Sequence, residues 1–212
     1  SLPLEAQERE RYLDLMAAQS ARMQTLVNDL LTLSRLEGSP LPGMNEPIDI
    51  RTLMEQCEAE ARGLSNLLHP PEGRPQHLRF AEPPSFQLTG AVSELRSAVS
   101  NLINNAVRYT PGGGTIDVRW ERLPDGRARL SVADTGPGIS PEHLPRLGER
   151  FYRVDRSRSR ESGGTGLGLA ITKHVVQRHG GELQVVSQLG QGTTFALTFP
   201  AQRVRPVPGV VS

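Results

Sequence analysis

The sequence predicts an α/β sandwich, in which a mixed β-sheet is layered with helices, preceded by one long helix. Residues 47–200 alternate between segments with strand-like periodicity and segments with helical spacing, the pattern of layered α/β domains. The turns Pro124-Asp125-Gly126 and Gly190-Gln191-Gly192 each separate two strand-like segments and predict antiparallel hairpins. Residues 5–37 contain neither Gly nor Pro and are rich in Leu, Glu, Arg, Ala and Gln, so they predict a single helix.

The charge and composition of the chain exclude several classes of protein. The 212 residues include 24 Lys and Arg against 23 Asp and Glu, so the formal net charge is +1 and the chain is not a bulk polyanion binder. No run of apolar residues approaches the ~18 that a membrane-spanning helix requires. Cys57 is the single cysteine, which excludes an intramolecular disulfide and a thiolate metal cage.

The long helix carries an apolar stripe that must be buried against another surface. Met16, Met23 and Leu30 lie seven residues apart, and Leu26 and Leu33 form a second row beside them. Pairing with another helix in a bundle is the favoured interpretation, because a Gly- and Pro-rich linker separates this helix from the α/β domain. Packing against the domain behind it is the alternative.

The remaining segments are predicted from periodicity and turn residues. The expected divisions are 1–38 for the long helix, 39–46 for the linker, 47–200 for the α/β domain and 201–212 for a disordered tail. Strands are expected over 47–50, 77–81, 86–88, 114–122, 127–134, 181–187 and 193–199. Helices are expected over 51–65, 91–108 and 166–179. Residues 136–165 are irregular and arginine-rich, which is typical of a lid over a functional site.

The helix predicted over 91–108 has two distinct faces. Asn101, Asn105, Arg108 and Tyr109 share one face by helical spacing. Asparagine is a poor residue for a helix interior, so the pair is either solvated or functional. The functional interpretation is a Mg²⁺ site, because amide oxygens suit this hard cation and Arg108 would meet phosphates. The buried stripe is expected to be Leu95, Ala98, Val99, Leu102 and Ala106.

Two glycine clusters point to a nucleotide. Asp134 ends a strand and is either a turn residue or a carboxylate that accepts a hydrogen bond from an exocyclic amine such as that of adenine. Gly136 and Gly138 would let the backbone approach the base closely. The run Gly163-Gly-Thr-Gly-Leu-Gly-Leu169 opens a helix, and a helix N-terminus with free N–H groups binds anions such as phosphate.

The order of these motifs is more specific than any single motif. Across about residues 10–200 the chain resembles the sensor histidine kinases, whose asparagine, glycine and phenylalanine boxes follow one another in this order. The stretches from Glu94 to Leu102 and from Pro145 to Ser159 resemble the phosphate-regulon members. The matching boxes are Asn101-Leu-Ile-Asn-Asn-Ala-Val-Arg-Tyr109, Asp134-Thr-Gly-Pro-Gly-Ile139, Phe151-Tyr-Arg-Val-Asp155, Gly163-Gly-Thr-Gly-Leu-Gly-Leu169 and Gly190-Gln-Gly-Thr-Thr-Phe195.

The resemblance implies a role for each matching residue in binding ATP and Mg²⁺. It implies Asn105 as the main Mg²⁺ ligand, supported by Asn101, and Arg153 near the γ-phosphate, and these three form the catalytic set. Phe151 would anchor the lid. The phosphates would meet Arg108, Tyr109 and the loop residues Gly164, Thr165, Gly166, Leu167 and Gly168. The adenine pocket would contain Asp134, Gly136, Gly138, Ile139, Thr193 and Thr194.

The resemblance also implies a fold, partners and a place in the cell. The fold is the Bergerat-type ATP-binding sandwich of the gyrase, chaperone and kinase superfamily, and the long helix is the second helix of the dimerisation bundle. The γ-phosphoryl group would pass to a histidine and then to an aspartate of a response regulator, in phosphate-starvation signalling. A homodimer is expected for the full-length protein. This part would lie in the cytoplasm, with the full-length protein anchored in the bacterial inner membrane.

One departure from the family pattern concerns the phosphate acceptor. The box His-Glu-Leu-Arg-Thr-Pro is absent, and none of the five histidines has its context, so we expect the acceptor helix to lie outside this sequence. Three alternatives remain. The first is a chaperone- or gyrase-like ATP hydrolase, whose general-base Glu would stand where Asn101 does. The second is a non-catalytic ATP-binding interaction module. The third, a nucleic-acid binder, is disfavoured by acids interleaved with the arginines, and no nucleic-acid partner is expected.

Overall fold

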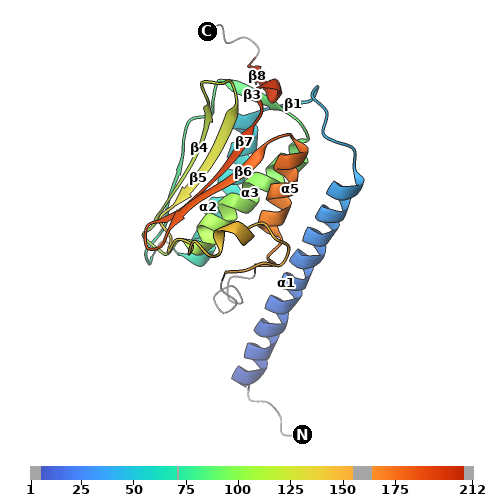
Figure 1. The fold of residues 1–212 in the computed structure, drawn as a ribbon. Helices are drawn as coiled ribbons and strands as arrows, with labels where there is room; N and C mark the ends of the chain where they lie inside the picture. The colour runs from blue at the N-terminus through green and yellow to red at the C-terminus, as the bar shows by residue number, and fades with distance from the viewer. Residues whose placement is uncertain (1–5, 71, 155–163, 208–212) are drawn as a thin grey trace.

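A five-stranded sheet, covered on one face by three helices, forms the body of the protein (Figure 1). This computed structural model describes residues 6–70, 72–154 and 164–207. The covering helices are α2 (Ile50–Leu68), α3 (Val92–Tyr109) and α5 (Gly168–Arg178). The strands of this sheet are β2 (His77–Phe80), β4 (Thr115–Arg122), β5 (Ala128–Asp134), β6 (Glu182–Gln188) and β7 (Gly192–Phe199). The predicted α/β sandwich with a mixed sheet is confirmed.

The sheet has the order β2-β4-β5-β7-β6, with β2 parallel to β4 and the other pairs antiparallel. Alternation sets its buried face, because neighbouring residues of a strand point to opposite sides. In β4, Ile116, Val118 and Trp120 are buried between more exposed neighbours. The register places Asp134, the last residue of β5, opposite Thr193 of β7, which brings two predicted site residues together.

Helix α3 packs between α2 and α5 and carries the predicted buried stripe. Its five predicted core residues, from Leu95 to Ala106, are at most 3% exposed. Asp49 caps the N-terminus of α2 by accepting a hydrogen bond from the backbone N–H of Arg51 at 3.0 Å. The helices therefore form where the sequence predicts them, and α3 holds its asparagine face away from the core.

The segment after Phe199 differs from the expectation of a disordered tail over 201–212. A short helix, Ala201–Arg203, leads into β8 (Val204–Pro206), which pairs antiparallel with β3 (Phe86–Thr89). Strand β3 also pairs with β1 (Pro47–Ile48), so a second, three-stranded sheet caps the domain. Residues 208–212 lie outside the described residues.

Arg203 explains why this segment is ordered. Its side chain is 5% exposed and donates hydrogen bonds to the backbone carbonyls of Pro42, Gly43, Thr89 and His179, at 2.6–3.1 Å. A guanidinium has five N–H donors in a fixed fork, so one buried side chain can join the linker, β3 and the end of α5. Composition alone gives no hint of these partners, which lie far away in the chain.

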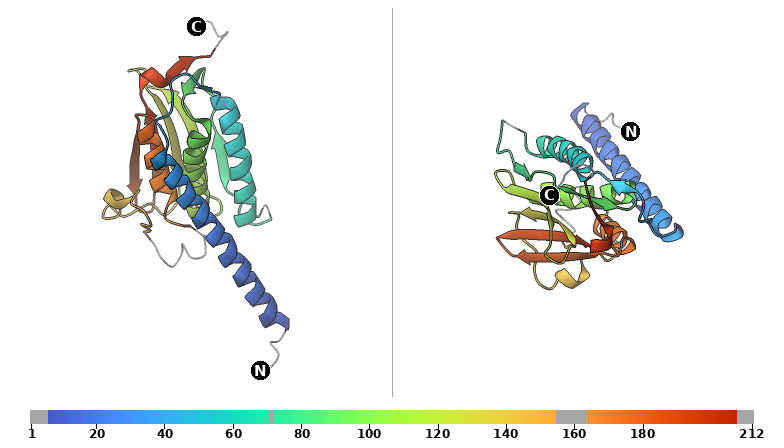
Figure 2. Two further views of the ribbon diagram at one scale, coloured as in Figure 1. Left: turned by 90° about the vertical axis from the view of Figure 1, so that its right-hand side faces the viewer. Right: turned by 90° about the horizontal axis from the view of Figure 1, so that it is seen from above.

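Helix α1 (Ala6–Gly38) packs on α5 with its C-terminal half only, while its N-terminal half projects beyond the sandwich (Figures 1 and 2). Leu33 is 4% exposed, whereas Met16 and Met23 remain 68% and 66% exposed. Packing against the following domain therefore accounts for Leu33, and pairing in a bundle stays a prediction for the exposed row. Among the described helices, none has a stretch long and apolar enough to cross a membrane.

The linker between α1 and the domain is fixed by a second buried arginine. Arg178 forms a two-pronged ion pair with Glu94, with both N–O distances 3.1 Å, and donates to the carbonyls of Leu36, Ser39 and Pro40. A buried carbonyl that loses a charged hydrogen-bond donor lowers the stability of the fold. Arg178 and Arg203 together therefore hold the linker against the domain.

We predict that Arg203→Ala lowers the free energy of unfolding by about 3 kcal/mol, because four carbonyls lose a charged donor. Chemical denaturation followed by circular dichroism measures the change. Arg205→Ala is the matched control, since Arg205 is exposed and, among the described residues, its side chain donates to the nearby carbonyls of Gln202 and Val204. Equal losses for the two variants would contradict the assignment of Arg203 as the residue that orders the tail.

Candidate nucleotide-binding site

A cleft of about 460 Å³ opens between α1, α3, the end of β5 and the loop before α5. Thirteen of the predicted site residues line it, so residues up to 92 positions apart in the chain meet in one hollow. They are Asn101, Asn105, Arg108, Tyr109, Asp134, Gly138, Ile139, Arg153, Gly164, Thr165, Gly166, Gly168 and Thr193.

The polar face of α3 forms one wall of the cleft. Asn101 and Asn105 stand one turn apart on it, and the side-chain amide of Asn101 donates to the carbonyl of Gly168 at 3.2 Å. This bond joins α3 to the first turn of α5. The neighbouring Asn104 also lines the cleft. Asn104 belongs to the same sequence motif, and its position on the predicted helix is the feature from which its place in the cleft could have been predicted.

Asp134, the last residue of β5, contributes a carboxylate to the cleft. Its Oδ1 accepts a hydrogen bond from the backbone N–H of Gly136 at 2.8 Å, and the N–H of Thr193 also donates to the carboxylate. Burial raises the pKa of Asp134 above its ordinary value, and these two hydrogen bonds oppose the shift. A half-buried carboxylate with unused acceptor capacity suits an amino group of a ligand.

Close backbone packing requires glycine beside this carboxylate. A Cβ on Gly138, which has φ +72°, would lie 2.1 Å from the carbonyl oxygen of Gln188. The backbone N–H of Ile139 donates to Ser187 Oγ at 2.8 Å, which fixes the turn against β6. Glycine is thus required at position 138 by its contact with the protein backbone. It shapes the cleft by allowing the turn to pack closely against β6.

The loop Gly164–Gly168 contributes four lining residues to the cleft, Gly164, Thr165, Gly166 and Gly168. Helix α5 begins at Gly168 after Leu167, and the side chain of this N-terminal cap residue has no hydrogen-bonding atom. The cap side chain therefore cannot satisfy the first N–H groups of α5, and a helix N-terminus of this kind attracts anions. Gly166 has φ +77°, and its carbonyl accepts from the N–H of Phe151 at 3.0 Å, which joins the middle of the predicted lid to the residue that follows it.

Four predicted residues do not line the cleft. Gly136 lies behind Asp134, where a Cβ would meet its Oδ1 at 2.8 Å. Phe151 is 55% exposed with φ +63°, and Leu167 is fully buried beneath the loop. Thr194 follows the lining residue Thr193, and alternation turns its side chain to the other face of the sheet. These four positions support the cleft or border it.

Part of the predicted lid falls outside the described residues. This concerns 155–163, which includes Asp155, Glu161, Gly163 and the last three arginines of the arginine-rich segment. The described part has the short helix Leu144–Arg146, and the guanidinium of Arg146 lies 4.1 Å from the centroid of the Tyr152 ring. Tyr152 also lines the cleft, and its hydroxyl is 2.7 Å from Nδ1 of His143.

Helix α1 contributes two lining residues that the sequence did not indicate, Thr25 and Asp29. Oδ2 of Asp29 accepts a hydrogen bond from Thr165 Oγ1 at 2.5 Å, across 136 positions of the chain. Burial raises the pKa of Asp29, and the bond from Thr165 opposes the shift. No local pattern in the sequence marks Asp29, because its role depends on how α1 docks.

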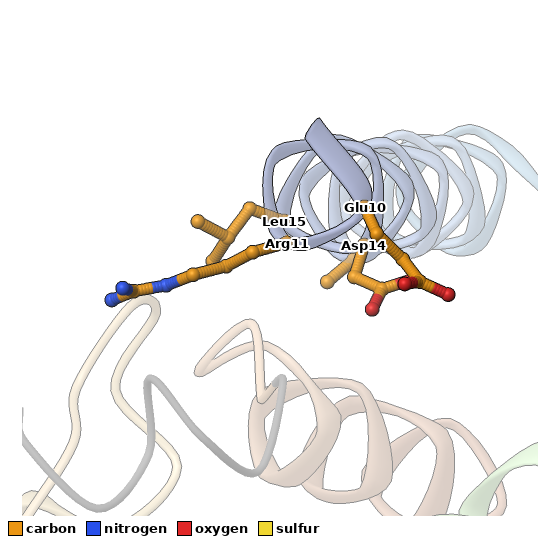
Figure 3. A pocket seen from close by; sticks show the side chains of 5 residues that line it. Glu10, Arg11, Asp14 and Leu15 are labelled. Carbon is orange, nitrogen blue, oxygen red and sulfur yellow. The ribbon is translucent and has the colours of Figure 1, made fainter. Parts of the chain in front are cut away.

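A second hollow, of about 530 Å³, lies beside the projecting half of α1 (Figure 3). Its lining residues are Glu10, Arg11, Asp14, Leu15 and Ala18, all from one helix. A hollow with a single helix as its wall does not surround a small ligand. The cleft between α1, α3 and α5 is therefore the candidate site.

The sequence profile of the histidine kinase-, DNA gyrase B- and HSP90-like ATPases matches residues 90–203, which span α3 to the start of β8. The chain belongs to this family. Within this ATPase family it is similar to the phosphate regulon sensor protein PhoR of Pseudomonas aeruginosa, with 49% identity over 91% of this chain and 42% of PhoR. The sensor-like histidine kinase SenX3 of Mycolicibacterium smegmatis is 34% identical over 90% of the chain and 48% of SenX3.

Solved structures of sensor kinases share the fold of this ATPase domain. The mycobacterial sensor histidine kinase MprB superposes with a TM-score of 0.63 at 32% identity, over 76% of this chain and 100% of that one. Full-length ShkA in complex with AMPPNP superposes with a TM-score of 0.72 at 28% identity, over 97% of this chain and 41% of ShkA. The chain is thus the catalytic ATP-binding part of a sensor histidine kinase, and it spans less than half the length of PhoR and SenX3.

We predict that Asp134→Asn stabilises the ligand-free protein at neutral pH. The folded protein holds the proton of Asp134 more tightly than the unfolded chain, so the wild type loses stability as pH rises from 3.8 through the folded pKa. Asparagine carries no charge, and its Oδ1 can still accept from Gly136. Each kcal/mol gained raises the melting temperature by roughly 2–4 °C, which calorimetry at pH 7 detects.

Asp125→Asn is the control with the opposite sign. Hydrogen bonds from the backbone and side chain of Arg127 lower the pKa of Asp125, which lies in the exposed hairpin turn. Its charge is therefore favourable in the folded state, and its removal should not stabilise the protein. An Asp134→Asn variant that melts at or below the wild-type temperature would contradict the prediction.

Proposed function

We propose that the cleft binds ATP with its adenine at Asp134 and its phosphates at the loop Gly164–Gly168. The observation that carries this proposal is that one cleft is lined both by the acidic acceptor Asp134 and by the N-terminus of helix α5. The adenine amino group would donate to the Asp134 carboxylate, and the first turn of α5 would meet the negative phosphates. Asn105, Arg108 and Arg153 line the same cleft.

We further propose that Asn105, supported by Asn101, binds Mg²⁺ together with the phosphates. Amide oxygens suit this cation, and among the described residues no group of three His, Cys, Asp or Glu side chains could hold it alone. Phosphate oxygens and water would complete its ligands. When bound, Mg²⁺ supplies charge neutralisation on the triphosphate.

The proposed reaction is transfer of the γ-phosphoryl group to a histidine imidazole on a bundle helix outside this sequence. The residues of the cleft would act by positioning and by charge, as phosphoryl transfer requires. The loop amides and the Arg153 guanidinium would stabilise charge that develops on the γ-phosphoryl oxygens. Arg108 and Tyr109 would close the cleft beside the phosphates.

Hydrolysis of ATP by the same cleft is the weaker candidate. Water attack needs a general base, and Asn101 has no basic oxygen at neutral pH and uses its amide to bind Gly168. Glu94, two turns before Asn101 on α3, is held in the ion pair with Arg178. These contacts favour transfer to a protein group over hydrolysis.

In the complete protein, we propose a membrane-anchored homodimeric sensor whose phosphohistidine passes its phosphoryl group to a response-regulator aspartate. The 49% identity to PhoR supports a role in phosphate-starvation signalling. The exposed row of Met16, Met23 and Leu30 would pair with the bundle helices that carry the acceptor. The cytoplasm would hold the part described here.

We predict that Asp134→Asn weakens ATP binding about 10- to 100-fold, because a hydrogen bond to a charged acceptor is worth about 1.5–3 kcal/mol. Calorimetric titration with and without Mg²⁺ measures this loss. Asn105→Ala should instead remove most of the advantage that Mg²⁺ gives to ATP. Asn66→Ala, on the exposed surface of α2, is the control. Wild-type protein that binds no ATP would contradict the proposal.

Transfer can be separated from binding by adding a second fragment. A helical hairpin that carries the acceptor box His-Glu-Leu-Arg-Thr-Pro is mixed with the protein and ATP labelled on the γ-phosphate. We predict acid-labile label on this hairpin, and none when its histidine is replaced by glutamine. Tight ATP binding without transfer would support the non-catalytic interaction module.

A further inference from the structure

The carboxylate of Asp29 lies at the end of the cleft where an anion is expected to bind. Thr25 and Asp29 are the residues of α1 that line the cleft, and Asp29 is the charged one. Its Oδ2 accepts from Thr165 Oγ1 at 2.5 Å, and the same hydroxyl oxygen accepts from the backbone N–H of Leu167 at 3.2 Å. A chain of two hydrogen bonds thus connects an acid of α1 to the N-terminal cap of α5.

The docking of α1 determines the position of this carboxylate. Leu26, Leu33 and Leu36 share a face of α1 with Asp29 by helical spacing and belong to, or pack against, the core cluster. Asp29 is therefore the acidic member of an otherwise apolar docking stripe. Farther along, Glu37 forms an ion pair with Arg150, the residue before Phe151.

The two polar contacts of α1 lie on either side of the segment between the phenylalanine and glycine motifs. Arg150 precedes this segment and Thr165 follows it, and Phe151 and Gly166 join its stems by a backbone hydrogen bond. A docked α1 therefore holds both stems at once. The loop that would receive phosphates is bound to an anion of the same chain while α1 stays in this position.

A negative charge at a phosphate-binding loop opposes the negative charge of the ligand. The first turn of α5 attracts anions through its N–H groups, and the carboxylate of Asp29 already lies beside it. At a partly buried site, like charges a few ångströms apart repel more strongly than in bulk water. The repulsion grows with the number of phosphates and is absent for a ligand with none.

We propose that Asp29 is an intramolecular anion that competes with the nucleotide phosphates for the loop Gly164–Gly168. In the docked position of α1 it lowers the affinity for ATP more than for ADP, and leaves that for adenosine unchanged. This inference rests on the proposed ATP site. According to this inference, α1 affects nucleotide affinity only while it contacts the loop. Movement of α1 away from Thr165 would release the site for ATP.

The burial of the Asp29 carboxylate opposes the docked position of α1. Desolvation raises the pKa of Asp29, so its ionised form is less favourable in the docked position than in water. Ionised Asp29 therefore favours undocking, while the apolar stripe favours docking. The contact between Asp29 and Thr165 therefore depends on the balance between the charge of Asp29 and the apolar packing of α1.

The test compares adenosine, ADP and ATP in calorimetric titrations of the wild type and Asp29→Asn. Asparagine retains an oxygen that can accept from Thr165, so the variant removes charge with little change of shape. We expect the affinity for ATP to rise about tenfold, that for ADP to rise less, and that for adenosine to stay constant. Asp14→Asn, in the projecting half of α1, is the matched control and should change none of the three.

The outcomes separate this inference from the proposed function. If Asp29→Asn leaves ATP binding unchanged, weakens it, or strengthens all three ligands equally, the inference is overturned while the ATP site stands. If the wild type binds neither adenosine nor ATP, the proposed site fails and the inference falls with it. Asp29→Ser, judged by the same ATP-to-adenosine ratio, replaces the asparagine variant if that variant does not fold.

Discussion

The contact between α3 and α5 determines where each part of the cleft lies. The asparagine face of α3 and the loop Gly164–Gly168 come from segments more than 60 residues apart, and the hydrogen bond from Asn101 to the Gly168 carbonyl joins them. Thr172 of α5 donates to the carbonyl of Ala98 on α3, and the ion pair between Arg178 and Glu94 fixes the far end of the same two helices. Both helices also bury aliphatic faces in one core. This close packing holds the polar side chains that α3 and α5 present to the cleft in fixed positions.

The charged groups of the cleft are held at a cost to the ligand-free fold. Asp134 and Asp29 are both half-buried acids whose pKa values burial raises, and neither forms a short ion pair among the described contacts. A fold optimised only for stability would replace them with neutral residues. Their presence in one cleft agrees with a ligand whose base donates hydrogen bonds and whose tail is anionic. Asp134 would attract the first part of this ligand, and Asp29 would repel the second.

The linker is more rigid than its composition suggests, and this affects how α1 can influence the cleft. Its prolines and glycines are typical of a flexible connection. Here Arg178 and Arg203 bind five carbonyls between Leu36 and Gly43, so the end of α1 is fixed to the domain. Displacement of α1 from the loop must therefore bend the helix, or break these bonds. The similarity to ShkA covers 97% of this chain, including α1, so a helix followed by this ATPase domain is an arrangement shared with ShkA.

The sequence by itself determined the layered fold, the order of its elements and the asparagine and glycine motifs, because each depends on local periodicity, turn residues or a short motif. Glycine runs and the pair Asn101 and Asn105 are visible without any tertiary contact. The ordered end of the chain and the roles of Arg203 and Asp29 were decided only by the tertiary structure. Arg203 acts on carbonyls about 24 to 161 positions away, and Asp29 meets Thr165 across 136 positions. No local pattern encodes such contacts, since they exist only after the helices and sheets have packed.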